Sequence, residues 1–122
     1  MANILVVDDD KDILLLLQRI LEGKGHDVTI FEDGNRALET VTEESYEVAL
    51  VDLFMPAVDG LELIPRLTAA APDMRIVAMS GGAMATGDTG LLKAAESFGA
   101  VATMMKPLSV SEVRDLVEGL LS

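Results

Sequence analysis

The chain has 122 residues, a length that fits one domain around a single hydrophobic core, and we predict one domain over residues 1–122. It has no cysteine, which excludes disulfides and thiolate metal sites, and its 21 acidic against 9 basic residues give a net charge of -12, which argues against direct binding to nucleic acid or to an anionic membrane. Its apolar runs are strand-sized or interrupted by charge, so we find no signal peptide or membrane span and expect a cytoplasmic protein.

Short apolar runs alternate with amphipathic segments along the whole chain. In chain order they predict a strand at 4–7, a helix within 13–21, a strand at 28–31, a helix within 37–41, a strand at 48–51, a helix within 61–67, a strand at 76–79, a helix within 91–98, a strand at 100–104 and a helix within 113–121. Pro65 lies inside the third helical segment, where it predicts a kink or a later helix start. His26 follows Gly25 in a predicted turn, and we expect it at the surface.

Strands that are apolar on both faces and separated by helices predict a parallel sheet covered by helices on both sides. Ligands of such sheets bind beyond the carboxyl ends of the strands, where the strand order reverses. The residues that follow the first, third, fourth and fifth strands are polar: Asp8, Asp9, Asp10, Asp52, Ser80 and Lys106. The candidate chemistry therefore gathers at one edge of the sheet.

Clustered carboxylates repel one another unless a cation lies among them, and a hard divalent ion such as Mg²⁺ suits their oxygens. One carboxylate could then attack an electrophile. A phosphoryl group fits best, because its transfer needs in-line positioning and neutralisation of charge. Asp52, Ser80 and Lys106 supply a nucleophile, a hydroxyl and an ammonium for this reaction.

Four motifs together resemble the receiver domain of bacterial two-component response regulators, as in chemotaxis-regulator-like, stand-alone receivers. They are Asp8-Asp9 after an apolar strand, the segment Asp52-x-x-Met55-Pro56-x-x-Asp59-Gly60, Ser80 after the fourth strand and Lys106-Pro107 after the fifth. The resemblance covers the whole chain in order and spacing. It implies a flavodoxin-like α/β fold, in which a doubly wound five-stranded parallel sheet of order 2-1-3-4-5 is flanked by five helices.

The resemblance also implies roles for single residues. Asp52 would accept a phosphoryl group from a histidine kinase or a histidine phosphotransfer protein. Asp9, Asp52 and the backbone carbonyl of Phe54 would hold Mg²⁺, and Asp8 would act mainly through its water. Asp10 stands where the family often has Glu, and we assign it to the cap of the first helix.

Two further roles concern the fourth and fifth strands. Ser80 would bond a phosphoryl oxygen, and Lys106 would pair with the carboxylate or phosphate charge. The resemblance implies that the Lys106-Pro107 bond is cis, which would aim the lysine into the site.

The chain departs from the family pattern at Thr103, where receiver domains usually carry Tyr or Phe. Ser80 and Thr103 are therefore the candidate switch pair, without the usual aromatic side chain. Our hypothesis is that the glycine-rich loop from Gly81 to Gly90 takes a larger part in switching, the alternative being a merely disordered connection.

Phe54, two residues after Asp52, is a bulky group where side chains influence the water that hydrolyses the acyl phosphate. We therefore expect it to prolong the phosphorylated state. Gly82, two residues after Ser80, has no side chain and leaves the other flank of the site open, which counts against this effect of Phe54.

These observations predict a phosphorylation-dependent switch that binds a downstream protein target as a monomer or weak dimer. Its enzymatic activity would be limited to Mg²⁺-dependent self-phosphorylation and slow auto-dephosphorylation. We expect a stand-alone regulator, with a receiver excised from a longer protein as the alternative. Two other readings stay open: a receiver-like interaction module that is never phosphorylated, and an aspartate-nucleophile phosphatase of the haloacid-dehalogenase type with Asp8 as nucleophile and Asp10 as acid/base.

Overall fold

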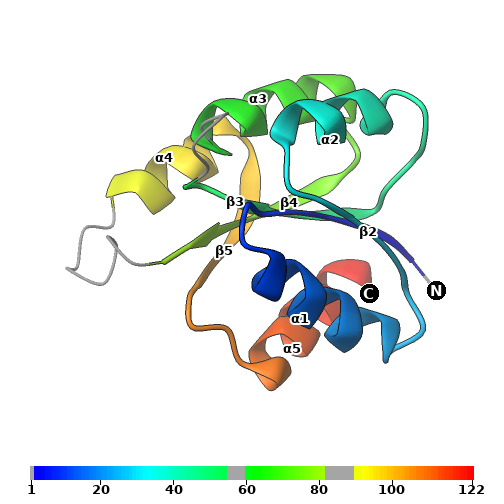
Figure 1. The fold of residues 1–122 in the computed structure, drawn as a ribbon. Coiled ribbons are helices and arrows are strands. Elements are labelled where there is room, and N and C mark those ends of the chain that lie inside the picture. Colours follow the sequence, from blue (N-terminus) through cyan, green and yellow to red (C-terminus); the bar gives the residue numbers. More distant parts are fainter. Residues whose placement is uncertain (1, 55–59, 82–89) are drawn as a thin grey trace.

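The computed structural model of the chain describes residues 2–54, 60–81 and 90–122. Strands and helices alternate through these residues (Figure 1): β1 Asn3–Val7, α1 Lys11–Glu22, β2 Asp27–Phe31, α2 Gly34–Val41, β3 Val48–Asp52, α3 Gly60–Ala70, β4 Arg75–Ser80, α4 Gly90–Phe98, β5 Ala100–Met105 and α5 Val110–Leu121. Every predicted strand is present and is one or two residues longer than the apolar run that predicted it.

The five strands form one parallel sheet in the order β2-β1-β3-β4-β5, which confirms the predicted fold. The chain proceeds from β1 to β2 on one side and then returns to place β3 on the other side of β1. This reversal of strand order lies between β1 and β3, and ligands of open parallel sheets bind beyond the carboxyl ends of the strands at such a point.

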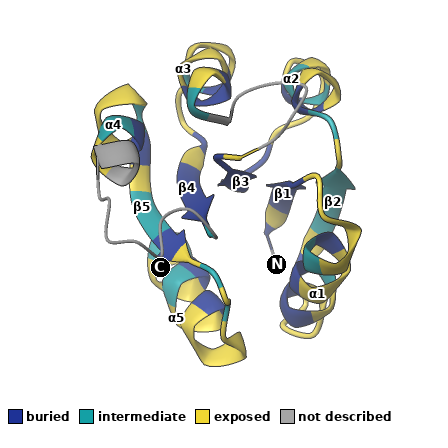
Figure 2. Ribbon diagram, turned by 60° about the vertical axis from the view of Figure 1, so that its left-hand side comes forward, coloured by how far each residue is buried: buried dark blue, intermediate teal, exposed yellow. Residues whose placement is uncertain are grey.

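Helices cover both faces of the sheet: α1 and α5 lie on one face, and α2, α3 and α4 lie on the other (Figure 1). A hydrophobic core lies on each face of the sheet, and successive residues of a strand pack alternately into one core and the other. In β1, Leu5 and Val7 pack with the α2 and α3 side, whereas Ile4 and Val6 pack with the α1 and α5 side. The central strands are therefore buried on both faces, and the exposed residues lie on the outer sides of the helices (Figure 2).

Short polar side chains cap the N-termini of α1, α2 and α5. Asp10, Asp33 and Ser109 have extended backbone, and their side-chain oxygens accept hydrogen bonds from backbone N–H groups in the first turns of α1, α2 and α5. The Asp10 Oδ1 to Asp12 N distance is 2.9 Å, so the predicted cap of the first helix is confirmed.

Helix α3 begins at Gly60 and continues through Pro65 to Ala70. The late helix start that Pro65 suggested is therefore wrong. The five residues that precede Pro65 in the helix place the proline just beyond the first turn.

His26 is buried, so its predicted surface position is wrong. Its side chain lies between the amino ends of β1 and β2 and the end of α5. His26 Nδ1 accepts a hydrogen bond from the Ala2 N–H at 3.2 Å, and Nε2 lies 3.0 Å from Glu118 Oε1. An accepting Nδ1 places the ring proton on Nε2, which donates to Glu118. His26 and Glu118 are 92 positions apart in the sequence, so no local sequence pattern predicts their contact.

Candidate functional site

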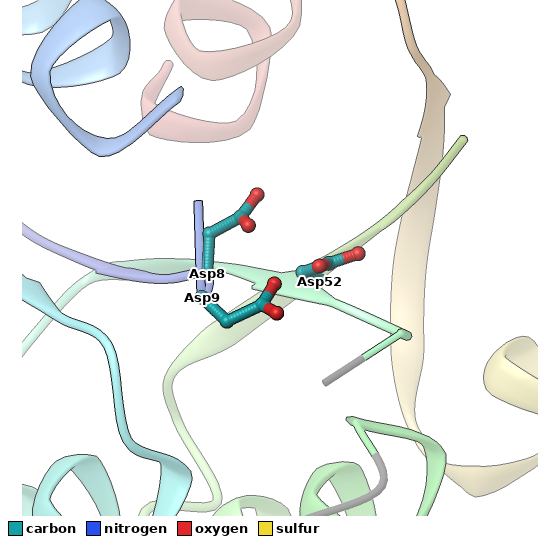
Figure 3. Close-up of side chains that lie close together, drawn as sticks. All are labelled: Asp8, Asp9 and Asp52. Atoms are coloured by element: carbon teal, nitrogen blue, oxygen red, sulfur yellow. The ribbon is translucent and has the colours of Figure 1, made fainter. Parts of the chain in front are cut away.

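Three carboxylates meet at the carboxyl edge of the sheet (Figure 3): Asp8, Asp9 and Asp52 have oxygen atoms within 4.8 Å of one another. Asp52 ends β3, and Asp8 and Asp9 directly follow β1. Because Val7 and Val51 are paired in register, the next residue of each strand arrives at the same level of the edge. Asp8 and Asp52 are 0% and 3% exposed, whereas Asp9 is exposed.

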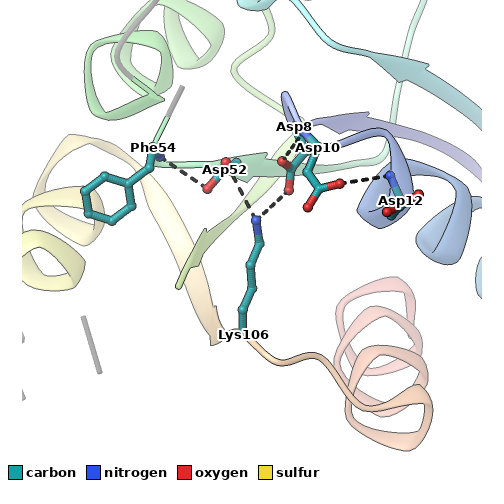
Figure 4. A network of polar contacts seen from close by, with 6 residues as sticks. All are labelled: Asp8, Asp10, Asp12, Asp52, Phe54 and Lys106. Carbon is teal, nitrogen blue, oxygen red and sulfur yellow. Dashed lines mark hydrogen bonds and ion pairs between the residues drawn. The ribbon is translucent and has the colours of Figure 1, made fainter. Parts of the chain in front are cut away.

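Lys106 joins the two buried carboxylates (Figure 4). Its Nζ donates to Asp8 Oδ2 at 2.8 Å and lies 3.7 Å from Asp52 Oδ2. The second oxygen of Asp8 accepts the Asp10 N–H at 2.9 Å, and Asp52 Oδ1 accepts the Phe54 N–H at 3.2 Å. The site therefore contains a partly buried ion pair between Lys106 and Asp8, and Lys106 makes a longer contact with Asp52.

A β-bulge in β5 sets the position of Lys106. Val101 has no partner in β4, so the pairing shifts by one residue and Ser80 lies opposite Met105. The backbone N–H of Lys106 then donates to the Ser80 carbonyl at 2.6 Å. A regular ladder would put Met104 opposite Ser80, and a shift of one residue turns each side chain to the other face of the strand.

Gly81 provides the surface on which the lysine stem lies. A Cβ atom at Gly81 would be 2.9 Å from Lys106 Cδ and 3.0 Å from Lys106 Cβ, closer than such atoms approach in folded proteins. The Lys106-Pro107 peptide bond is cis, as the sequence resemblance implies. Gly81 was predicted only as the first residue of the glycine-rich loop, because no local pattern predicts its contact with Lys106.

Burial dominates the ionisation of Asp52. It raises the pKa of this carboxyl, the negative charge of Asp8 raises it further, and the Phe54 N–H and the Lys106 ammonium lower it, so that the pKa is about 7. For Lys106, burial lowers the pKa, but the hydrogen bond to Asp8 and the charges of Asp8 and Asp52 outweigh it and raise the pKa overall. Lys106 is therefore an ammonium at neutral pH.

The donor set fits a hard divalent cation. Three carboxylates with oxygens within 4.8 Å are ligands that Mg²⁺ prefers, and the negative charge of Asp8, second to burial, raises the pKa of Asp52 even with Lys106 beside them. The Asp9 carboxylate makes no hydrogen bond or ion pair within the described residues. Asp9 is therefore ready to accept a cation directly.

Ser80 is the last residue of β4 and is fully buried. Its Oγ has no hydrogen-bond partner in residues 2–54, 60–81 and 90–122. Thr103 lies in the middle of β5, half-buried, opposite Ala78. Thr103 is thus two positions deeper in the sheet than Met105, the partner of Ser80. The Met55, Pro56 and Asp59 motif and the loop residues 82–89 lie outside the described part of the chain.

The response regulator receiver domain family matches residues 4–118. The chain belongs to this family. Receiver domains are signalling modules of two-component systems, and phosphorylation and Mg²⁺ binding at an acidic pocket are typical of the family. None of the helices in the described part of this receiver is both long and apolar enough to cross a bilayer.

Known receivers of several organisms are similar to the chain. Sporulation initiation phosphotransferase F of Bacillus subtilis is 30% identical over 116 residues, which cover 95% of this chain and 90% of that protein. The DNA-binding transcriptional regulator NtrC of Azospirillum brasilense is 37% identical over 117 residues, but the chain spans only 24% of that regulator. The crystal structure of a CheY-like receiver protein from Methanospirillum hungatei has a TM-score of 0.88 and 29% identity, covering 98% of this chain and 94% of that one.

We expect Asp52 to oppose folding in the ionised form when no divalent cation is present. Because its folded pKa of about 7 exceeds the ordinary value of 3.8, its stabilising contribution is complete below about pH 4 and is lost as pH rises through 7. Asp52→Asn should therefore gain stability over wild type across this window, by on the order of 1–4 kcal/mol at pH 8. Urea unfolding in EDTA at several pH values measures the difference, and exposed Asp73→Asn is the control. A difference that does not change with pH would contradict the assignment.

The contact between Gly81 and Lys106 predicts a non-additive pair of substitutions. Gly81→Ala should destabilise the wild type by about 1–2 kcal/mol, because the lysine stem must move off its surface. The cost should shrink by about 1 kcal/mol in a Lys106→Ala background, which lacks the Cδ atom. Gly119→Ala is the control, since its Cβ meets nothing within 4 Å. Strictly additive free energies of unfolding would show that the two side chains do not share this space.

Proposed function

We propose that this receiver is a phosphorylation switch in which Asp52 accepts a phosphoryl group from a histidine kinase or a histidine phosphotransfer protein. The observation that carries the proposal is the convergence at one edge of the sheet of Asp52, an ammonium and the buried Ser80 hydroxyl, which has no hydrogen-bond partner among the described residues. A phosphoryl group has oxygens to accept from both donors, and its transfer is governed by positioning and charge neutralisation.

The contacts favour Asp52 over its neighbours as the acceptor. Each oxygen of Asp8 already accepts a hydrogen bond, one from the Asp10 N–H at 2.9 Å and one from Lys106 at 2.8 Å, which stabilises its charge and makes it the weaker nucleophile. Asp9 is exposed to water. Asp52 Oδ2 is 3.7 Å from Lys106, beyond a hydrogen bond, and is therefore the buried carboxylate oxygen that is least engaged.

In the reaction, an Asp52 oxygen attacks phosphorus, the bond from phosphorus to the donor imidazole nitrogen breaks, and that nitrogen keeps the electron pair. The product is an acyl phosphate on Asp52. Lys106 would pair with the negative charge of the phosphoryl group, and the Ser80 hydroxyl would donate to one of its oxygens. Mg²⁺, held by Asp9, Asp52 and the Phe54 carbonyl with Asp8 acting through water, would supply further charge neutralisation.

The signal follows from the added charge. A phosphoryl group brings about one further negative charge and new acceptor oxygens, so Ser80 and Lys106 gain a partner that the free carboxylate does not offer them. Ser80 ends β4 and Lys106 follows β5, so we place the response in these strands and in α4 and α5, where a downstream protein would bind. Thr103 would contribute through packing of a small side chain.

The relatives support phosphoryl transfer, since one of them is named a phosphotransferase. A cytoplasmic, stand-alone protein, as a monomer or weak dimer, remains our prediction. The phosphatase reading is disfavoured because Asp8 is fully paired and the Asp10 side chain caps α1. A receiver-like module that is never phosphorylated remains the alternative that the following experiment decides.

Intact mass after incubation with acetyl phosphate tests the proposal. We expect a Mg²⁺-dependent gain of one phosphoryl group in wild type and in Asp12→Asn, a control on the exposed side of α1, and no gain in Asp52→Asn. A gain that persists in Asp52→Asn would move the acceptor to Asp8. If neither acetyl phosphate nor a purified phosphorylated histidine phosphotransfer protein modifies the wild type, the alternative of a receiver-like module that is never phosphorylated is correct.

Phe54 should lengthen the life of the acyl phosphate. Its side chain is 44% exposed and lies on the side of Asp52 away from Asp8 (Figure 4), where it hinders water that approaches from that side. Asn at this position would admit and orient water, so Phe54→Asn should lose the phosphoryl group about two to ten times faster than wild type. Decay of the phosphorylated mass after removal of the donor gives the rate, with Phe98→Asn, 45% exposed, as the control. Equal or faster decay in wild type would refute this role.

A further inference from the structure

Met105 lies beside Ser80 at the carboxyl ends of β4 and β5. The two residues are partners in the parallel register of these strands. Partners in a parallel pair direct their side chains to the same face of the sheet. This face is the one covered by α2, α3 and α4, because Ala78, two residues before Ser80, belongs to the core on that side. The thioether of Met105 and the hydroxyl of Ser80 therefore belong to neighbouring side chains.

Met105 is also the accessible methionine of residues 2–54, 60–81 and 90–122. It is 46% exposed, whereas Met74, Met79 and Met104 are between 0% and 6% exposed. A peroxide oxidises an accessible thioether to a sulfoxide, which methionine sulfoxide reductases convert back. The sulfur lone pair attacks one peroxide oxygen, the oxygen–oxygen bond breaks, and the departing hydroxide takes the proton of the transferred oxygen to form water. Sulfur is oxidised in this step and the peroxide is reduced.

Oxidation changes what Met105 offers to the Ser80 hydroxyl. Ser80 is fully buried, and its Oγ has no hydrogen-bond partner in the described part of the chain. A thioether sulfur is only a weak acceptor, so reduced Met105 leaves this hydroxyl available to a phosphoryl oxygen. A sulfoxide brings a polar oxygen to the neighbouring side chain. Because a buried donor without a partner is costly, the hydroxyl favours such an acceptor.

We propose that Met105 is a reversible oxidation site for peroxides, and that its sulfoxide accepts a hydrogen bond from Ser80 and so slows phosphorylation of Asp52. The inference rests on the proposed function, in which the Ser80 hydroxyl donates to the phosphoryl group. It goes beyond that function by giving the site a second input, the redox state of its surroundings. Lys106 and the carboxylates keep their contacts, so the oxidised protein is inhibited but folded.

Phosphorylation rates before and after peroxide treatment test the inhibition. Peptide mass spectrometry should find one added oxygen on Met105 at peroxide doses that leave Met104 unmodified. The oxidised wild type should be phosphorylated by acetyl phosphate and Mg²⁺ about tenfold more slowly than the reduced protein, and methionine sulfoxide reductase should restore the rate. Met105→Leu should keep its rate after the same treatment. An unchanged rate in oxidised wild type, or an equal loss in Met105→Leu, would overturn the proposal.

A second comparison identifies Ser80 as the group through which oxidation acts. In Ser80→Ala, peroxide should change the phosphorylation rate by less than about twofold. In urea unfolding, oxidation should raise the folding equilibrium constant of wild type about fivefold more than that of Ser80→Ala. Equal effects of oxidation on both proteins would refute the hydrogen bond. The unfolding comparison uses no phosphodonor, so failure of the acetyl phosphate reaction rejects the proposed function separately.

Discussion

The partly buried contact between Lys106 and Asp8 is the interaction on which the arrangement of the site depends. Asp8 is 0% exposed, and removing one partner of such a pair costs about 3–5 kcal/mol because the other charge is left buried without compensation. The contact joins β1 to the segment after β5, which are not neighbours in the sheet. Asp52 lies between them on β3, and its Oδ2 is 3.7 Å from Lys106 Nζ, farther than the Asp8 oxygen. The proposed phosphoryl acceptor is therefore the carboxylate that is less compensated by Lys106, and burial raises its pKa to about 7.

The parallel direction of the strands makes this arrangement possible. All five carboxyl ends point to one edge, and the strand order brings residues that are 44 and 98 positions apart from Asp8 into one cluster. The apolar strands below are buried on both faces, so they hold the edge rigidly. The polar groups at the edge have no such packing to fix them, and their positions follow from register, hydrogen bonds and charge.

The parallel sheet and the membership of the cluster were predictable from local patterns, whereas the strand order came from the family resemblance. Each apolar run gave a strand, and parallel topology places Asp8, Asp9, Asp52 and Lys106 at one edge. The bulge at Val101 was not predictable, since an extra residue in one strand is defined only by its pairing partner in another. The contact of Gly81 with Lys106 and the burial of His26 likewise depend on segments distant in sequence. Helix periodicity also could not decide how Pro65 is accommodated.

The two ends of the sheet differ in how completely their polar groups are paired. At the amino end, the His26 ring joins the Ala2 N–H to Glu118 and uses both of its nitrogens. At the carboxyl end, the buried Ser80 Oγ has no partner in the described residues, and Asp52 has a pKa near 7. An unsatisfied buried hydroxyl and an undercompensated carboxyl both destabilise the protein in its resting state. A ligand that brings positive charge and acceptor oxygens would relieve both at once, so the same groups that cost stability would favour the cation and the phosphoryl group that we propose for this site.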